Sequence, residues 1–305
     1  MTDLDVEPAD APAADTGVVP FWRRLGLPGL VDVHTHFLPA RMLRRVWAHF
    51  DAAGPLIGRR WPIRYRWSEA DRVAHLRTLG VRRFTALTYA HRPGMAADLT
   101  DWALGFAERT PGCAPSATFF PEPGVKRYVA AALERGAAVF KVHVQVGGFD
   151  LRDEQLDDVW GLLAEAGVPV VVHAGSGPVP RGGLTGPGPL GEVLHRHPAL
   201  VAVVAHMGSP EYEGFLELAE RYPRVHLDTT MAFTDFFEDT APFPPDLLPR
   251  LKALQDRVVL GSDFPNIPYP YAHQLEALQR LGLGDDWLRD VVWHNGSRLL
   301  NGARA

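Results

Sequence analysis

The sequence is poor in cysteine and contains no long hydrophobic run. Its 305 residues include one cysteine, Cys113, so no disulfide can form within the chain. This composition is typical of a protein from a reducing compartment, and we expect a cytoplasmic location. No apolar run reaches the roughly 20 residues that a membrane-spanning helix needs. We therefore expect no membrane partner.

An excess of positive charge is also absent. The formal net charge is -5 at pH 7, which gives no overall attraction for nucleic acid or an anionic membrane surface. The first twenty residues are acidic and rich in Ala, Pro and Asp, and they lack the basic start and apolar core of a signal peptide. We predict that residues 1–20 form a disordered leader and that residues 21–305 form a single domain, because no linker divides them.

What the sequence does contain is a regular alternation of short apolar runs with helix-patterned segments. Eight runs predict strands, at residues 30–36, 82–89, 114–120, 137–145, 168–173, 200–206, 224–229 and 257–262. Helices are predicted at residues 68–79, 95–109, 124–135, 153–166, 188–197, 209–222, 245–255, 273–282 and 285–300. This order is typical of an α/β fold with a parallel sheet and crossover helices. Eight units fit a (β/α)8 TIM barrel; an open doubly wound sheet, which normally has fewer strands, is the alternative.

The first predicted strand delivers two histidines with a spacing of two. Val31-Asp32-Val33-His34-Thr35-His36 is apolar up to this pair, and side chains two apart on a strand point to the same face. Two neutral imidazoles on one rigid strand form half of a transition-metal site. Asp32 shares their face, where it could support a ligand or simply pack low in the barrel.

Polar residues also end other predicted strands. His173 ends the fifth strand, His206 the sixth and Asp263 the eighth, and Lys141 and His143 share one face of the fourth. Each residue alone has a structural interpretation, since strand-end histidines are often hydrogen-bonded edge residues and strand-end aspartates often cap helices. Several strands of one chain ending this way favour a shared site, because barrel enzymes carry their chemistry at the C-terminal ends of the strands.

These motifs together resemble a known family. VDVHTH, FKVH, VVVHAG, VAHMG and GSDFP, in this order, are similar to the amidohydrolase superfamily. The resemblance covers residues 29–301 and is strongest to the amidohydrolase-2 (amidohydrolase-related) branch, which includes enzymes similar to aminocarboxymuconate-semialdehyde decarboxylase. It implies a distorted (β/α)8 barrel with one or two divalent metal ions at its C-terminal face.

The resemblance also implies roles for individual residues. Carried over by position, His34, His36, His173 and Asp263 would bind the metal, and His206 would act beside them as an acid/base or carbonyl-polarising residue. In members with two metals a lysine of the fourth strand is carboxylated and bridges them, so Lys141 is an additional candidate ligand. A lysine paired with a carboxylate in a polar barrel interior is the alternative. Zinc is the expected ion, with manganese or iron as alternatives.

Such a centre predicts a metal-dependent hydrolase that uses a metal-activated water on a small-molecule amide, ester or lactone, with Asp263 transferring the proton. A lyase that uses the same metal for non-oxidative decarboxylation or hydration of a small carboxylic acid is the main alternative. A barrel that has kept its ligands but catalyses nothing is a third interpretation.

The loops give weaker indications about the substrate. We assign His143, His91, Arg181 and Arg64 to substrate binding, because they lie near strand ends or in loops that follow them. The segment 59–67 mixes arginine with aromatic residues and predicts either a lid or a solvated hairpin. An arginine there could bind a carboxylate of the substrate. Relatives often dimerise, so a homodimer is compatible with the sequence.

Overall fold

The computed structural model describes residues 15–52, 54, 59–178 and 181–301. Within them, short strands run parallel in two hydrogen-bonded sets, β1-β2-β3 and β4 to β9 in chain order. The strands are β1 (Leu30–Asp32), β2 (Val81–Thr85), β3 (Cys113–Ala114), β4 (Ser116–Thr118), β5 (Val139–His143), β6 (Val170–His173), β7 (Ala202–Val204), β8 (Val225–Asp228) and β9 (Val258–Val259).

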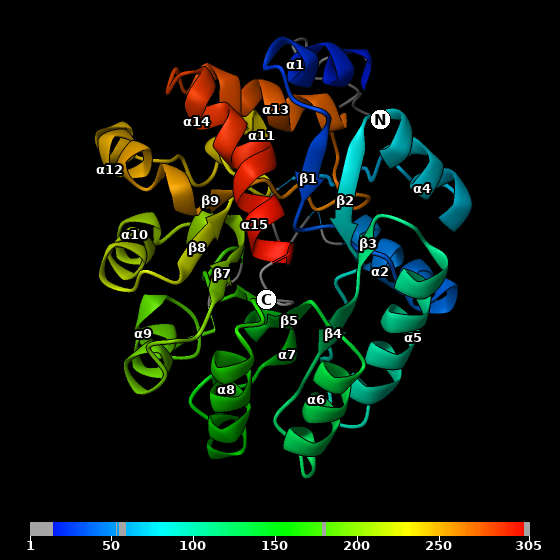
Figure 1. Cartoon of the computed structure of the whole chain (residues 1–305), viewed down its shortest axis with the longest axis vertical. Helices are drawn as coiled ribbons and strands as arrows, with labels where there is room; N and C mark the ends of the chain where they lie inside the picture. The colour runs from blue at the N-terminus through cyan, green and yellow to red at the C-terminus, as the bar shows by residue number, and fades with distance from the viewer. Residues whose placement is uncertain (1–14, 53, 55–58, 179–180, 302–305) are drawn as a thin grey trace, which may run out of the picture.

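Backbone contacts join the two sets into a ring. The amide of Val33 donates to the carbonyl of Leu260 at 2.9 Å, and the amide of Asp263 donates to the carbonyl of His34 at 2.9 Å. On the other side, β3 and β4 are one strand interrupted at Pro115, which has no amide hydrogen to continue a ladder. The result is a (β/α)8 barrel with the strands at the centre and the helices around them (Figure 1).

The predicted helices surround the ring in the expected order, and four helices that were not predicted, α1, α2, α7 and α11, add to them. They are α1 (Val18–Arg24), α2 (Ala40–Ala52), α4 (Glu69–Thr78), α5 (Ala96–Arg109), α6 (Val125–Glu134), α7 (Val144–Gly147), α8 (Glu154–Ala166), α9 (Pro187–Arg196), α10 (Tyr212–Arg221), α11 (Asp235–Glu238), α12 (Leu248–Ala253), α13 (Tyr271–Arg280), α14 (Asp285–Arg289) and α15 (Asn295–Asn301). Among the described residues, no helix combines the length and apolar composition needed to cross a bilayer.

Alternation along the strands divides the core in two. In β6, Val170 and Val172 pack outward against the helices, whereas Val171 points into the barrel. Side chains in the other strands or just after them join this cluster, and α15 contributes the last two: Val31, Val33, Leu87, Ala114, Val139, Val203, Ala205, Val259, Leu299 and Leu300. The interior is therefore a packed core, and chemistry is confined to the strand ends above it.

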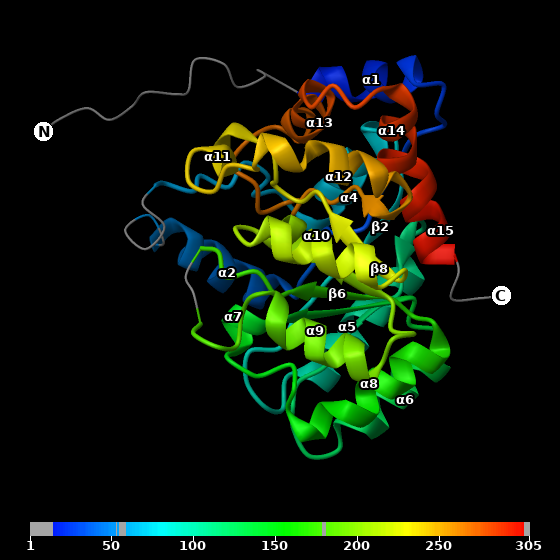
Figure 2. The ribbon, with the colours of Figure 1, turned by 90° about the vertical axis from the view of Figure 1, so that its left-hand side faces the viewer.

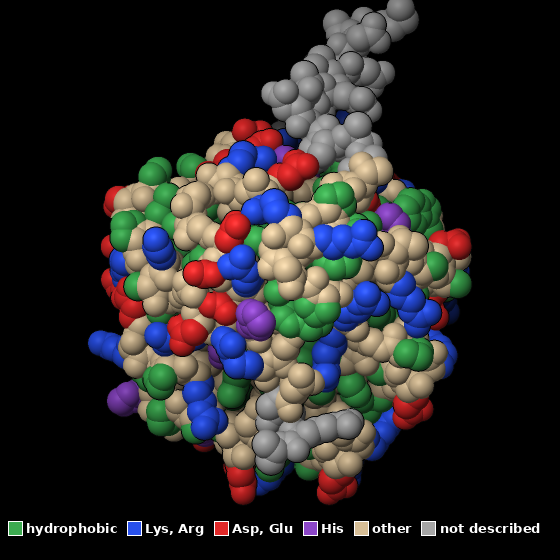
Figure 3. All heavy atoms as spheres, turned by 45° about the horizontal axis from the view of Figure 1, so that its top comes forward, with side chains coloured by type: hydrophobic (Ala, Val, Ile, Leu, Met, Phe, Trp, Pro, Cys, Tyr) green, Lys and Arg blue, Asp and Glu red, His purple; other side chains and the backbone are tan. Residues whose placement is uncertain are grey.

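Figure 2 shows which end that is. The helices α2, α7 and α11, which follow β1, β5 and β8 directly, lie together at one end of the molecule, and α15 lies at the opposite end. The face shown in Figure 3 carries acidic and basic side chains interspersed rather than gathered by sign.

The predicted barrel is confirmed, but several predicted boundaries are wrong. The strands are shorter than expected: the strand predicted at 200–206 stops at Val204, because His206 adopts a left-handed conformation with φ 55°. The strand predicted at 137–145 stops at His143, where α7 begins. The helix α2 was not predicted, although Leu43, Val46 and Phe50 recur at the spacing of one helix face; Leu43 is buried and the other two are half-buried.

The predicted disordered leader is also too long. Residues 15–17 form a 3-10 helix and α1 starts at Val18, which is fully buried; Phe21 and Trp22 of the same helix are also buried, at 9% and 7% exposure. These apolar side chains pack on the barrel, and that burial offsets the entropy cost of ordering the segment. Residues 1–14, the rest of the predicted leader, lie outside the described residues.

Candidate metal centre

The two histidines that follow β1 are held by their Nδ1 atoms. His34 Nδ1 lies 2.8 Å from Asp228 Oδ2, and His36 Nδ1 lies 2.9 Å from the carbonyl oxygen of Leu87. A carbonyl oxygen or an ionised carboxylate can only accept, so in both rings Nδ1 carries the hydrogen. The Nε2 lone pairs of His34 and His36 are therefore available for a metal ion. In metalloenzymes a partner on the other ring nitrogen commonly fixes the tautomer of a metal-binding histidine in this way.

Asp228 is the residue at this site that the sequence analysis missed. Besides accepting from His34, its Oδ1 accepts the backbone amides of His206 at 2.9 Å and Thr230 at 3.0 Å. Burial alone would raise the pKa of Asp228, but the hydrogen bond from His34 and the charge of Lys141 lower it overall, so the carboxylate is ionised. It ends β8, so the strand-end criterion that selected Asp263 would have selected it too.

His206 enters the site from the end of β7. Its backbone and that of Met207 are left-handed, with φ of 55° and 57°, a conformation that non-glycine residues rarely adopt and that is often found at functional sites. Nδ1 lies 3.1 Å from the carbonyl oxygen of Thr230, so it donates and leaves Nε2 bare. Burial lowers the pKa of His206, which keeps the ring neutral and able to bind a metal.

Asp263, after β9, also has a left-handed backbone, with φ 67°. Its Oδ1 lies 2.8 Å from His36 Nε2 and 3.6 Å from His34 Nε2. The chain after β9 passes so close to His34 and Thr230 that position 261 requires glycine. A Cβ there would lie 2.1 Å from Thr230 Oγ1 and 2.8 Å from the Cβ of His34. Asp263 is nearly buried, at 9% exposure.

These side chains form a group with the chemistry of a metal site. Ligand atoms of His34, His206 and Asp263 all lie within 4.8 Å of one another. The contact of His36 Nε2 with Asp263 Oδ1 joins two atoms that both carry lone pairs, and two acceptors this close repel unless a cation or proton lies between them. Imidazole nitrogens and a carboxylate oxygen suit zinc, manganese or iron. The residues present fit a divalent ion.

Lys141 points into the same site from β5. It pairs in register with Val171, an interior residue, and is 1% exposed. Its Nζ lies 3.2 Å from His34 Nε2. Burial lowers the pKa of Lys141 to about 8, although the nearby charges of Asp228 and Asp263 act in the opposite direction. The predicted candidate ligand therefore does reach the centre, and a lysine with a lowered pKa is more readily uncharged.

His173 and His143 lie beside this group as a stacked pair. Their ring centroids are 3.8 Å apart with an interplanar angle of 12°, and His173 lies 4.8 Å from the ring of His206. His173 Nε2 faces the carbonyl oxygen of Gly177 at 3.2 Å, which leaves Nδ1 bare. His143 Nδ1 accepts the amide of Val146 at 3.3 Å, so in the neutral ring the hydrogen is on Nε2.

The four residues of the predicted ligand set thus occupy different positions. His34 and Asp263 belong to the three-residue group, His36 contacts it through Asp263, and His173 contacts it through the ring of His206. His206, predicted as an acid/base residue, is the third member of the group. The residue roles taken from the family pattern stay predictions.

The predicted substrate-binding residues lie further out. His91, Arg64 and Arg181 are exposed, and the only side-chain hydrogen bond described for Arg181 runs from Nε to the carbonyl of Gln145 at 3.1 Å. His143 is the one that reaches the centre, through its stack on His173.

The arginine-rich segment 59–67 packs over the strand ends. Trp61 Nε1 donates to the carbonyl of Asn266 at 2.6 Å, and its ring contacts Phe236 at 4.8 Å. The guanidinium of Arg59 lies 3.9 Å above the Phe236 ring. The neighbouring Phe237 stacks on His206 at 5.8 Å. Of the two expectations for this segment, the packing favours a lid over a solvated hairpin.

Comparisons with known proteins agree with this fold. The model of the amidohydrolase family matches residues 31–302. An uncharacterized TIM-barrel protein from Bordetella bronchiseptica superposes with a TM-score of 0.72 at 18% identity, covering 90% of this chain and 100% of that one. Dihydroorotase from Campylobacter jejuni superposes with a TM-score of 0.54 at 13% identity, covering 90% and 83%. These structures are similar in fold.

A curated relative matches in part. The chain is 27% identical over 218 residues to the mycothiol acetyltransferase of Thermobifida fusca, which covers 62% of this chain and 56% of that protein. The chain thus spans little more than half the length of this relative. The family match spans almost the whole barrel, from β1 to α15, and includes every member of the candidate metal group. The chain belongs to the amidohydrolase family.

Proposed function

We propose that the protein is a metal-dependent hydrolase that cleaves an amide, ester or lactone bond of a small molecule. Membership of the amidohydrolase family supports an enzyme of the hydrolase type. The observation that supports the metal dependence is the orientation of His34 and His206. Each ring donates its Nδ1 hydrogen to a fixed acceptor, so its Nε2 lone pair is available for a metal ion shared with Asp263.

The residues that would hold the ion are His34, His206 and Asp263, with His36 and His173 as the further candidates from the family pattern. A bound divalent ion would supply Lewis-acid chemistry, polarising a substrate carbonyl and lowering the pKa of water to about 7. Lys141 is the candidate for a bridging ligand if two ions bind, since its Nζ is already beside His34.

The side chains themselves divide the remaining work. Burial alone would raise the pKa of Asp263, but its contacts with His36, His34 and His206 lower it, so the carboxylate is ionised. It is the carboxylate placed to take a proton from water at an Oδ atom and return it to the leaving group. His143 offers an Nε2 hydrogen that can donate to a substrate oxygen.

The surroundings support a small substrate. His34, His206 and Asp263 are at most 9% exposed, and Trp61 and Arg59 of the lid pack on Phe236 beside them. A buried site of this kind excludes water from the reacting groups and strengthens every charge interaction within it. The exposed guanidinium of Arg181 is a candidate partner for a carboxylate at the rim.

The test is metal analysis combined with activity. Protein prepared without chelators should contain at least one equivalent of divalent metal and should hydrolyse a member of a panel of small amides, esters and lactones. His34→Ala should lose metal and activity together, whereas His195→Ala, an exposed histidine of α9, should keep both. Metal-free protein, or a His34→Ala variant with full activity, would refute the proposal.

Product analysis in labelled water separates hydrolysis from the decarboxylase alternative. A hydrolase incorporates one oxygen from H₂¹⁸O into the product. Carbon dioxide release without that incorporation would assign the protein to the decarboxylases instead, with the same metal site.

A further inference from the structure

The N-terminal segment, which precedes the part matched by the family model, contacts the barrel through one buried carboxylate. Asp15 Oδ2 accepts from Tyr65 Oη at 2.6 Å and lies 2.8 Å from His75 Nε2. Its side chain is 11% exposed. Burial alone would raise the pKa of Asp15, but the hydrogen bonds of His75, Tyr65 and Ala272 lower it, so the carboxylate is ionised.

This carboxylate also caps a helix that is distant in sequence. The residue before α13 is Pro270, whose side chain cannot accept a hydrogen bond. The first free amides of α13 are satisfied from elsewhere: Ala272 donates to Asp15 Oδ1 at 3.0 Å, and Tyr271 donates to Tyr65 Oη at 2.7 Å. A negative charge at a helix N-terminus is also favourable for the helix dipole.

From α13 the same chain of contacts continues to the metal centre. Tyr271 is fully buried, and its Oη donates to Asp32 Oδ2 at 2.8 Å. Asp32 Oδ2 also accepts from Ser262 Oγ at 2.5 Å, and Asp32 Oδ1 accepts the amide of His34 at 3.1 Å. The Asp32 carboxylate thus ties the end of β1 to the residue before Asp263.

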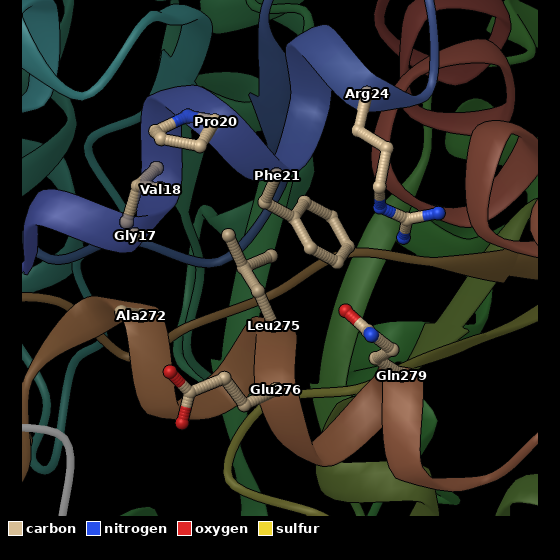
Figure 4. A pocket seen from close by; sticks show the side chains of 9 residues that line it. All are labelled: Gly17, Val18, Pro20, Phe21, Arg24, Ala272, Leu275, Glu276 and Gln279. Atoms are coloured by element: carbon tan, nitrogen blue, oxygen red, sulfur yellow. The ribbon is translucent and has the colours of Figure 1, made fainter.

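The rest of the contact between the N-terminal segment and α13 is loosely packed. A cavity of about 220 Å³ lies between α1 and α13, lined by Val18, Phe21 and Arg24 on one side and Leu275 and Gln279 on the other (Figure 4). Arg24 pairs with Asp285 at 2.9 Å, but both side chains are more than 40% exposed. The buried hydrogen bonds of Asp15 are therefore the specific connection here.

We infer that Asp15 is a positioning residue for the metal centre, acting through Tyr65, Tyr271 and Asp32 on the strand end that carries His34. The inference rests on the proposed metal-dependent function. The N-terminal segment then does more than cover the barrel, because it helps to hold the ends of β1 and β9, which are followed by His34 and Asp263, in position. Outer contacts of this kind commonly change metal affinity when they are removed.

The test uses Co²⁺ on the full chain, with affinity measured by chelator competition and ligand geometry by the visible absorption spectrum. Asp15→Asn keeps the shape of the side chain but has one accepting oxygen where the carboxylate has two, so it cannot serve Tyr65, His75 and Ala272 together. We expect it to weaken Co²⁺ binding about 5- to 10-fold and to alter the spectrum. Tyr271→Phe, which removes the next hydrogen bond, should act similarly.

Two comparisons separate positioning from simple stabilisation. The double variant Asp15→Asn/Tyr271→Phe should have the same Co²⁺ affinity as the single variant with the larger loss, because both substitutions break the same chain of contacts. Arg24→Gln, which loosens α1 at its exposed ion pair, should bind Co²⁺ within twofold of wild type. The inference is overturned if Asp15→Asn lowers the melting temperature but leaves Co²⁺ affinity within twofold, or if the two losses add fully. Wild-type protein that binds no Co²⁺ would instead remove the proposed function, and this inference with it.

Discussion

The replacement Asp228→Asn tests how the centre prepares His34. In the wild-type protein Asp228 Oδ2 accepts from His34 Nδ1, while Oδ1 accepts the amides of His206 and Thr230. An asparagine can keep its oxygen on the two amides, which turns its NH₂ group toward His34. Because that group can only donate, His34 Nδ1 becomes the acceptor and the ring hydrogen moves to Nε2. The lone pair that should bind the metal is then lost.

The expected loss follows from the number of contacts changed. In the variant His34 is held in the wrong tautomer, while the side-chain oxygen at position 228 keeps its hydrogen bonds to the amides of His206 and Thr230. Loss of a partner behind a ligand commonly costs 10- to 100-fold in metal affinity, which is about 1.4–2.8 kcal/mol of binding free energy. We expect Asp228→Asn to fall in this range and to lose activity at metal concentrations that saturate the wild-type protein.

The assay is metal affinity by chelator competition, together with ¹⁵N NMR of the histidine rings of the metal-free protein. The NMR spectrum should place the hydrogen of His34 on Nδ1 in wild type and on Nε2 in the variant. Asp235→Asn, which changes an exposed aspartate at the start of α11, the helix after the same strand, is the control. Unchanged affinity with the His34 hydrogen still on Nδ1 would refute the reasoning.

Two further predictions concern stability. Gly261→Ala should destabilise the protein by about 2–4 kcal/mol in urea unfolding, because its Cβ would collide with side chains of the centre, whereas Gly188→Ala, which has open space around it, should change stability by less than about 1 kcal/mol. Burial lowers the pKa of His226 to about 4, so the unfolded chain takes up a proton first as the pH falls below about 6.5, and stability falls with it. Between pH 7.5 and 5.0 the free energy of unfolding of the wild-type protein should fall by about 1–2 kcal/mol more than that of His226→Leu. Equal decreases in the two proteins would contradict the assignment of a neutral histidine.

The barrel could be predicted because it depends on patterns that are local in sequence. Apolar runs such as Val168 to Val172 specify strands that are buried on both sides, and the helical segments between them leave few topologies. The ends of the strands could not be placed, because they are decided by tertiary contacts. At His206, for example, a left-handed backbone held by Asp228 ends β7 earlier than the apolar run suggests.

The centre was predicted in part for a similar reason. The strand-end criterion identified His34, His206 and Asp263 but did not distinguish the atoms each would present. Asp228 ends a strand as well, but the predicted strand 224–229 runs one residue past it and so does not mark it as a strand end. Its role depends on contacts to residues 194 and 22 positions away, which spacing cannot show.

The N-terminal segment shows the limit of composition as a guide. An acidic stretch rich in alanine and proline indicates disorder, yet Asp15 is buried because its partners Tyr65, His75 and Ala272 come from distant parts of the chain. The three partners of this one charged residue cannot be inferred from the composition of the segment around it.

Anomalous diffraction at the zinc, iron and manganese edges, from crystals of protein never exposed to chelators, tests the central claim most directly. The account predicts an anomalous peak about 2.0–2.2 Å from His34 Nε2, His206 Nε2 and a carboxylate oxygen of Asp263. A second peak beside Lys141 would identify it as a bridging ligand. The account is contradicted if no peak appears at any edge, or if the only peaks lie away from these three side chains.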